Sequence, residues 1–165
     1  MRLRLLVALF TLLIAPIDDA DAAELRPFGR GTWQELRQAY AGQPTVVHFW
    51  ALSCGPCLVE LPLWGTLVRE RRDLRLVLVN TDRVLEKPER MVATLDKAGL
   101  GDVENWVFAD RFQERLRFEV DPDWRGELPR TVLIARDGAV TAFSGAADPT
   151  TLRRWLDGQV QDSSR

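Results

Sequence analysis

The run "PTVVHFWA" at residues 44–51 constrains the fold more than any other segment of the chain. It joins β-branched and aromatic residues over the length of one strand, with little alternation between apolar and polar positions. A strand of this kind is buried on both faces, and such burial requires a sheet with helices packed on its two sides. The fold class predicted from this run is therefore α/β.

Helical and strand patterns alternate through the rest of the chain. From residue 55 the apolar residues fall at helical spacing, with Pro62 inside the helix, where it is expected to introduce a kink. Further strands are predicted at 74–82, 105–110, 130–135 and 139–145, and further helices at 32–42, 87–101, 111–120 and 150–160. The order α-β-α-β-α-β-α-β-β-α predicts a mixed central sheet with helices on both faces, closed by a hairpin at Arg136-Asp137-Gly138.

The N-terminus has the three parts of a secretory signal peptide. Basic residues come first, an apolar run follows at residues 5–14, and Ala20-Asp21-Ala22 is a cleavage site of the A-x-A kind. We expect residues 1–22 to be removed by cleavage, with an uncleaved membrane anchor as the alternative. The mature region then divides into an irregular lead-in at 23–31, one domain at 32–162 and a C-terminal tail at 163–165.

Two local details define the start of this domain. Thr32 and Glu35 fit a capping box, and Gly42 is placed to end the first helix.

A length of 165 residues suits one domain, and a net charge of −2 argues against a nucleic-acid binder, which usually carries a basic surplus.

The chain holds two cysteines, Cys54 and Cys57, at the junction of a predicted strand and helix. A cysteine at a helix N-cap faces unpaired N–H groups and the positive end of the helix dipole, which stabilise its thiolate. A second cysteine one turn later can then resolve a mixed disulfide formed by the first. A redox centre is therefore the leading interpretation of the pair.

Two other interpretations of the cysteine pair have less support in the sequence. A fixed structural disulfide would close a very small loop and remove little entropy from the unfolded chain. A structural zinc site usually takes four Cys or His ligands, whereas this chain offers three, because His48 is its single histidine. No metal site is therefore predicted.

Several segments together resemble the thioredoxin superfamily. They are Phe49-Trp50-Ala51, Cys54-Gly55-Pro56-Cys57, Glu60 with Pro62, the strand end at 79–82, and Leu128-Pro129 followed by "RTVLIARDG". More narrowly, they resemble the exported TlpA/ResA-like thiol-disulfide oxidoreductases of bacteria, which include cytochrome c maturation proteins. The resemblance spans about residues 30 to 160. It implies a thioredoxin-like fold, a periplasmic location, and no cofactor beyond the redox-active Cys54–Cys57 disulfide.

The resemblance also assigns roles to individual residues. Cys54 would be the nucleophile and Cys57 the resolving thiol. Pro129 would be cis, and its loop, with Leu128, would offer backbone groups to an extended substrate segment. Trp124, beside this loop, is a candidate substrate contact. The alternative for Pro129 is an ordinary proline at the start of a strand.

Two further residues are candidates for moving or tuning a proton. Glu60 shares the helix face turned toward Cys57, where a partly desolvated carboxyl could exchange protons near neutral pH. The alternative is a solvated glutamate favoured by the helix dipole. His48 stands where thioredoxins place a buried aspartate. It could pass a proton to Cys57, but we favour a hydrogen-bonded core histidine with a lowered pKa.

The function expected is a periplasmic reductase of protein disulfides. Clients would be apocytochrome c or a copper-site protein, the electron donor a membrane protein of the CcdA/DsbD type, and the protein a monomer. Gly-Pro between the cysteines favours reduction, because strongly oxidising relatives usually carry a histidine there. The alternatives are a disulfide oxidase or isomerase, a copper-binding chaperone of the same fold, and a catalytically idle interaction domain. Ser53, where many relatives carry tryptophan, implies a different docking surface.

Overall fold

The computed structural model describes residues 24–82 and 87–162. The predicted signal peptide at 1–22 and the tail at 163–165 lie outside these residues. Among the helices of the described part, none is long and apolar enough to cross a membrane.

Six strands form one sheet in the order β1-β4-β3-β2-β5-β6, and five helices pack against it. The strands are β1 Leu25–Phe28, β2 Thr45–Trp50, β3 Arg75–Asn80, β4 Glu104–Phe108, β5 Arg130–Ile134 and β6 Val140–Ser144. The helices are α1 Thr32–Ala39, α2 Gly55–Glu70, α3 Pro88–Lys97, α4 Gln113–Val120 and α5 Pro149–Asp162. The first four strands of the chain pair in parallel, whereas β5 pairs antiparallel with β2 and β6, so the predicted mixed sheet is confirmed.

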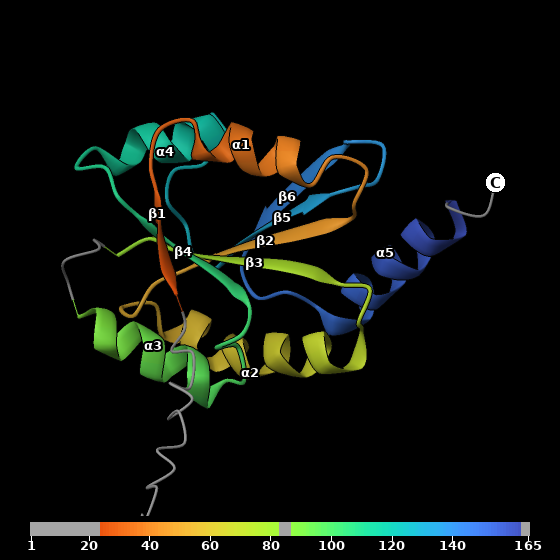
Figure 1. The fold of residues 1–165 in the computed structure, drawn as a ribbon, viewed down its shortest axis with the longest axis horizontal. Helices are drawn as coiled ribbons and strands as arrows, with labels where there is room; N and C mark the ends of the chain where they lie inside the picture. Colours follow the sequence, from red (N-terminus) through yellow and green to blue (C-terminus); the bar gives the residue numbers. More distant parts are fainter. Residues whose placement is uncertain (1–23, 83–86, 163–165) are drawn as a thin grey trace, which may run out of the picture.

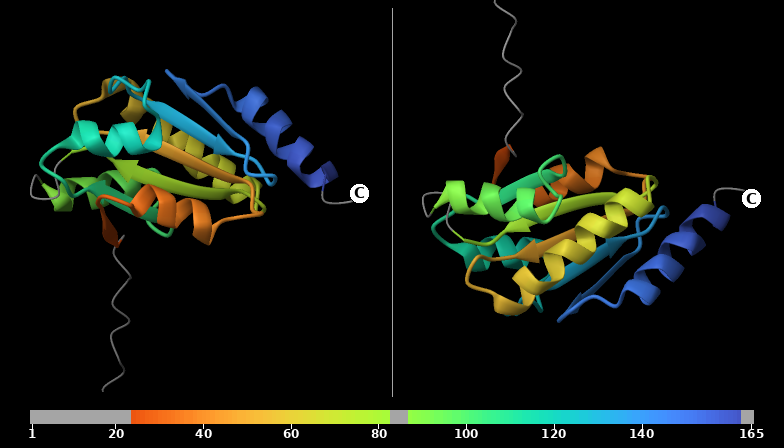
Figure 2. Two further views of the ribbon diagram at one scale, coloured as in Figure 1. Left: turned by 90° about the horizontal axis from the view of Figure 1, so that it is seen from above. Right: turned by 90° about the horizontal axis from the view of Figure 1, so that it is seen from below.

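Helices cover both faces of the sheet, as predicted. Figure 1 shows α1 and α4 on one face and α2 and α3 on the other, and Figure 2 shows α5 running past the β6 edge. Every residue of β2 is buried, because its two neighbouring strands and both helical layers cover it. Val47 and Phe49 face the α1/α4 core, and Val46 and Trp50 face the α2/α3 core. β2 is an inner strand of the sheet, so its carboxyl end, where the chain turns into α2, lies near the middle of the sheet's edge.

The lead-in predicted as irregular contains a strand. β1 pairs in parallel with β4 at the edge of the sheet, and Phe28 is fully buried. The sequence does not predict this strand, because Pro27, Gly29 and Gly31 are residue types that strands usually exclude. An edge strand tolerates proline, because one side of its backbone has no partner. The pairing depends on β4, about 80 residues later in the chain, so no local pattern announces it.

The capping box predicted for α1 is not formed. Gly31 is the N-cap, in the left-handed region at φ 83°, and no side chain caps the helix. The hydroxyl of Thr32 instead accepts a hydrogen bond from the Gly29 N–H at 3.1 Å. The helix also ends at Ala39, before Gly42, which lies in the following turn at φ 78°.

The other predicted elements are present, with ends that differ by a few residues. α2 runs as one helix from Gly55 through Pro62 to Glu70, and the kink predicted at Pro62 stays a prediction. The hairpin between β5 and β6 is confirmed: the Ala135 N–H donates to the Ala139 carbonyl, and Gly138 has a φ of 85°.

Candidate redox site

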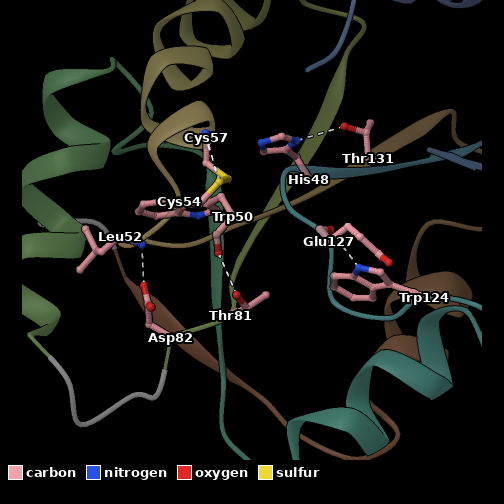
Figure 3. The surroundings of a disulfide bond; sticks show 10 residues. All are labelled: His48, Trp50, Leu52, Cys54, Cys57, Thr81, Asp82, Trp124, Glu127 and Thr131. Atoms are coloured by element: carbon pink, nitrogen blue, oxygen red, sulfur yellow. Dashed lines mark hydrogen bonds between the residues drawn. A yellow bond between two sulfur atoms is a disulfide. The ribbon is translucent and has the colours of Figure 1, made fainter. Parts of the chain in front are cut away.

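The turn between β2 and α2 is tied to the end of β3. The Leu52 N–H donates to the Asp82 carboxylate at 2.6 Å, and the Thr81 N–H donates to the Trp50 carbonyl at 2.8 Å. The side-chain oxygen of Asn80 in turn accepts from the Asp82 N–H at 2.7 Å. Figure 3 shows Asp82 and Thr81 below the cysteine pair, and its dashed line at Thr81 marks a further bond, from the Thr81 hydroxyl to the Trp50 carbonyl at 3.3 Å. The three residues at the end of β3 therefore fix the loop that presents Cys54.

Cys54 and Cys57 form a disulfide at the start of α2, as shown in Figure 3. Cys54 is the N-cap, and its sulfur accepts a hydrogen bond from the Cys57 N–H at 3.2 Å. Pro56 lies in the first turn, where its missing N–H leaves no helix bond unmade. Cys54 is half-buried and Cys57 is fully buried. An external sulfur can therefore reach Cys54, whereas Cys57 is reached through Cys54.

Glu60 lies one turn further along α2, on the buried side. Its side chain is 5% exposed, and one carboxylate oxygen accepts from the Ala147 N–H at 2.9 Å. Burial raises the pKa of the Glu60 carboxyl above its usual range. The Ala147 N–H, which donates to the carboxylate, lowers the pKa and offsets part of this rise. The nearby Trp64 indole N–H acts in the same direction more weakly, because it lies close to the carboxylate but outside hydrogen-bond geometry. The alternative of a solvated Glu60 is excluded by this burial.

His48 is fully buried beneath the same helix. Its Nδ1 lies 3.1 Å from the Thr131 hydroxyl, and its ring packs against Trp64 with centroids 4.9 Å apart. Burial lowers the pKa of His48 to about 3, so the imidazole is neutral near neutral pH. These contacts support the core-histidine interpretation, because a base with so low a pKa takes up little proton at that pH.

The peptide bond between Leu128 and Pro129 is cis, as the resemblance implied. β5 starts at the next residue, with Arg130 paired to Phe49 of β2, so Pro129 lies level with the end of β2. Leu128 is half-buried and packs on the core cluster that contains Cys57. The structure thus brings this loop to the same end of the sheet as the cysteine pair. The role of Leu128 and Pro129 in binding a substrate stays a prediction.

The prediction of a direct substrate contact by Trp124 is revised. Its side chain is 4% exposed, because it packs on Phe49 with ring centroids 4.8 Å apart. Its indole N–H donates to the Glu127 carbonyl at 3.0 Å, a bond visible in Figure 3. Trp124 therefore fixes the loop before Pro129 through its bond to the Glu127 carbonyl, and it offers almost no surface to a substrate.

Two contributors to the site were missed by sequence reasoning. Asp82 follows a buried strand, and its carboxylate reaches the loop of the neighbouring parallel strand, β2, through the Leu52 N–H. Trp64, which packs on His48 and neighbours Glu60, had no signal beyond helical spacing. Among residues 24–82 and 87–162, no group of three or more His, Cys, Asp or Glu is placed to hold a metal ion.

No protein-family model and no curated protein sequence matches the chain. Solved structures do resemble it. A secreted Mycobacterium tuberculosis disulfide oxidoreductase homologous to Escherichia coli DsbE is 20% identical, with a TM-score of 0.59 over 73% of this chain and 85% of that one. A thiol:disulfide interchange protein of the thioredoxin family from Chlorobium tepidum is 18% identical, with a TM-score of 0.57 over 74% and 83%. The chain has the thioredoxin-like fold.

Proposed function

We propose that this protein is a thiol-disulfide oxidoreductase that reduces disulfides in protein clients. The observation that carries the proposal is the asymmetry of the pair: Cys54 is half-exposed at the N-terminus of α2, and Cys57 is buried behind it. This is the arrangement that a two-step exchange requires, with one sulfur open to attack and the other protected.

The reaction starts from the reduced pair. The Cys54 thiolate attacks one sulfur of the client disulfide, forms a mixed disulfide and releases the other client sulfur as a thiolate. The Cys57 thiolate then attacks Cys54, closes the Cys54–Cys57 bond and releases the second client thiolate. Two electrons pass from the protein to the client, and the thiol protons go to the two released client sulfurs. Glu60, with its raised pKa, is the group we assign to proton exchange with Cys57.

Reduction is the proposed direction because Gly55 and Pro56 separate the cysteines, as in the reducing thioredoxin motif. Each turnover leaves the pair oxidised, so the cycle needs an electron donor, for which we propose a membrane protein of the CcdA/DsbD type. An extended client segment would bind along the Leu128-Pro129 loop, at the end of β5, through hydrogen bonds between its backbone and the backbone of this loop.

The signal-like residues 1–22 support a periplasmic location, with cleavage after Ala22. In that compartment the clients proposed are apocytochrome c haem-binding cysteines or the cysteine pair of a copper-site protein, and the protein acts as a monomer. Trapping clients on Cys57→Ser, which stalls the mixed disulfide on Cys54, identifies them. Recovery of no disulfide-linked client would contradict a role in reducing proteins.

Equilibration of the cysteine pair with glutathione tests the direction. A potential near the thioredoxin value of about −270 mV supports a reductase, and one near about −120 mV contradicts it and favours an oxidase. Insulin reduction is the matched activity assay. Retention of Cu(I) against a strong competitor, together with no reduction of insulin, would favour the copper chaperone instead.

A further inference from the structure

Helices α2 and α3 form a groove of about 550 Å³ on the lower side of the molecule. Figure 1 shows both helices beneath the sheet, and Figure 2 shows that side from below. One stripe of each helix lines the groove: Leu58, Leu61 and Pro62 from α2, and Arg90, Ala93, Thr94, Lys97 and Ala98 from α3 and the residue after it. These positions recur at three- and four-residue intervals, so each stripe is a single helix face.

One end of the groove lies a helical turn from Cys54, because the N–H of Leu58, which lines the groove, donates to the Cys54 carbonyl at 3.1 Å. Leu58 is 38% exposed, and Pro62, one turn further along α2, is also exposed. Further along, the helices come into close contact, since a Cβ on Gly65 would lie 1.9 Å from the Ala98 carbonyl oxygen. The groove therefore runs along α2 from Leu58 toward this contact and presents the exposed apolar side chains of Leu58 and Pro62.

The charge of the groove is positive. Arg90 and Lys97 line it, and no acidic side chain does. Neither cation forms an ion pair with any residue in the described part of the chain. This local excess stands out because the whole chain carries a net charge of −2.

We propose that this α2/α3 groove binds the flank of a client polypeptide that carries apolar and acidic side chains beside its disulfide cysteine. The inference rests on the proposed function and specifies its substrate class. Apolar client side chains are buried against Leu58 and Pro62, while client carboxylates meet Arg90 and Lys97. The client cysteine is thereby held near Cys54, which lies one helical turn from the groove.

Two matched peptides test this preference. One is acetyl-Glu-Glu-Leu-Cys-Leu-Glu-Glu, and the other carries glutamine in place of each glutamate; both hold their cysteine as a mixed disulfide with thiopyridine. In a single turnover, the reduced protein is expected to react with the acidic peptide with a second-order rate constant about tenfold higher at low salt, at about threefold for each of Arg90 and Lys97. High salt screens these exposed charges and removes most of the preference. Neutral dithiodipyridine measures the activity that needs no groove.

Three variants locate the preference. The double variant Arg90→Gln with Lys97→Gln is expected to reduce both peptides at nearly the same rate and to reduce dithiodipyridine as the unaltered protein does. Lys87→Gln is the matched control, because Lys87 immediately precedes α3 but does not line the groove. Leu61 is buried in the core, so Leu58→Ser is the variant that tests the apolar part. It is expected to slow both peptides and to leave dithiodipyridine unaffected.

A second measurement does not depend on the redox chemistry. Lys87 and Lys97 are the two lysines of the chain. Carboxyl-to-amine cross-linking of the acidic peptide, with serine in place of its cysteine, to the oxidised protein is therefore expected at Lys97 and much less at Lys87.

The outcomes separate the two proposals. Equal turnover of both peptides, with equal cross-linking at the two lysines, overturns the groove and leaves the oxidoreductase intact. Cross-linking at Lys97, with no reduction of any disulfide, keeps the groove and overturns the proposed function. Protection of Lys97 by phosphatidylglycerol vesicles, without a peptide preference, overturns the client proposal in favour of a membrane surface.

Discussion

The two faces of the sheet hold cores of different character, and two tryptophans show the difference. Trp124, in the α1/α4 core, packs on Phe49 and donates its indole N–H to a carbonyl at 3.0 Å. Trp64, in the α2/α3 core, packs on His48, and its indole N–H has no hydrogen-bond partner among the described residues.

The same contrast extends to the neighbours of each tryptophan. Phe28, Phe49 and Phe108 fill the α1/α4 core with edge and tilted ring contacts at 5.4 to 6.3 Å between centroids. Beneath the cysteine pair, His48 and Glu60 each keep one buried atom that has no partner in the described part of the chain. Unpaired buried polar groups reduce stability, whereas well-packed aromatic rings add to it. The comparison indicates that both cores stabilise the fold, and that the α2/α3 core also holds the buried polar groups beside the proposed redox site.

The largest expected effect is on activity and comes from the α2 side. Cys54→Ser removes the nucleophile, so insulin reduction is expected to fall by at least about a thousandfold, or about 4 kcal/mol in activation free energy. Stability changes little, because the lost disulfide closes a very small loop. Retention of more than a tenth of the activity would show that another group carries the reaction.

The second effect is on stability and comes from the other face. Phe108→Ala is expected to lower the free energy of unfolding by about 3 to 5 kcal/mol, because it opens a cavity among the aromatic rings. Phe108→Leu keeps most of the volume and serves where the alanine variant does not fold. The redox potential of either folded variant is expected to match that of the unaltered protein. A shifted potential would contradict this difference between the two cores.

The third effect is the acid sensitivity contributed by His48. Its folded pKa of about 3 lies below the ordinary value of 6.5, so the unfolded chain binds the extra proton in this interval. The stabilisation is present above pH 6.5 and is lost as the pH falls from 6.5 toward 3, at about 1.4 kcal/mol per pH unit. Denaturant unfolding is therefore expected to show a loss of about 2 kcal/mol between pH 7 and pH 5 that is absent from His48→Asn. Thr131→Val, which keeps the histidine, is the control and should retain the slope.

The smallest effect concerns Glu60 and has the opposite sign. Its pKa is raised in the folded protein, so the folded state binds more protons and stability falls as the pH rises from its ordinary value of 4.5 through the folded value. Glu60→Gln is expected to flatten this part of the stability profile and to remove one inflection from the pH–rate profile of insulin reduction. The rate should change by about tenfold or less, because Cys57 can still exchange its proton with solvent. Glu70→Gln, an exposed position on the same helix, should change neither profile.

The elements near the site were predictable because their signals are local. The burial of β2, the start of α2 at Cys54 and the β5/β6 hairpin each follow from a short run of residues. β1 was not predictable, because its strand character comes from pairing with β4 far along the chain. The capping of α1 was mispredicted because the Thr32 hydroxyl bonds the preceding turn instead of the helix.

The sequence by itself determined which atoms could do chemistry and where they lie along the chain: two sulfurs at a strand–helix junction, and one carboxyl a turn later. Only the tertiary structure decided their environments. Burial beneath α2 made His48 a neutral core residue, placed Glu60 out of water and turned Trp124 from a surface contact into a support for the loop. Reactive residue types are written in the sequence, whereas pKa values and access depend on the solvent that neighbouring elements, distant in the chain, exclude.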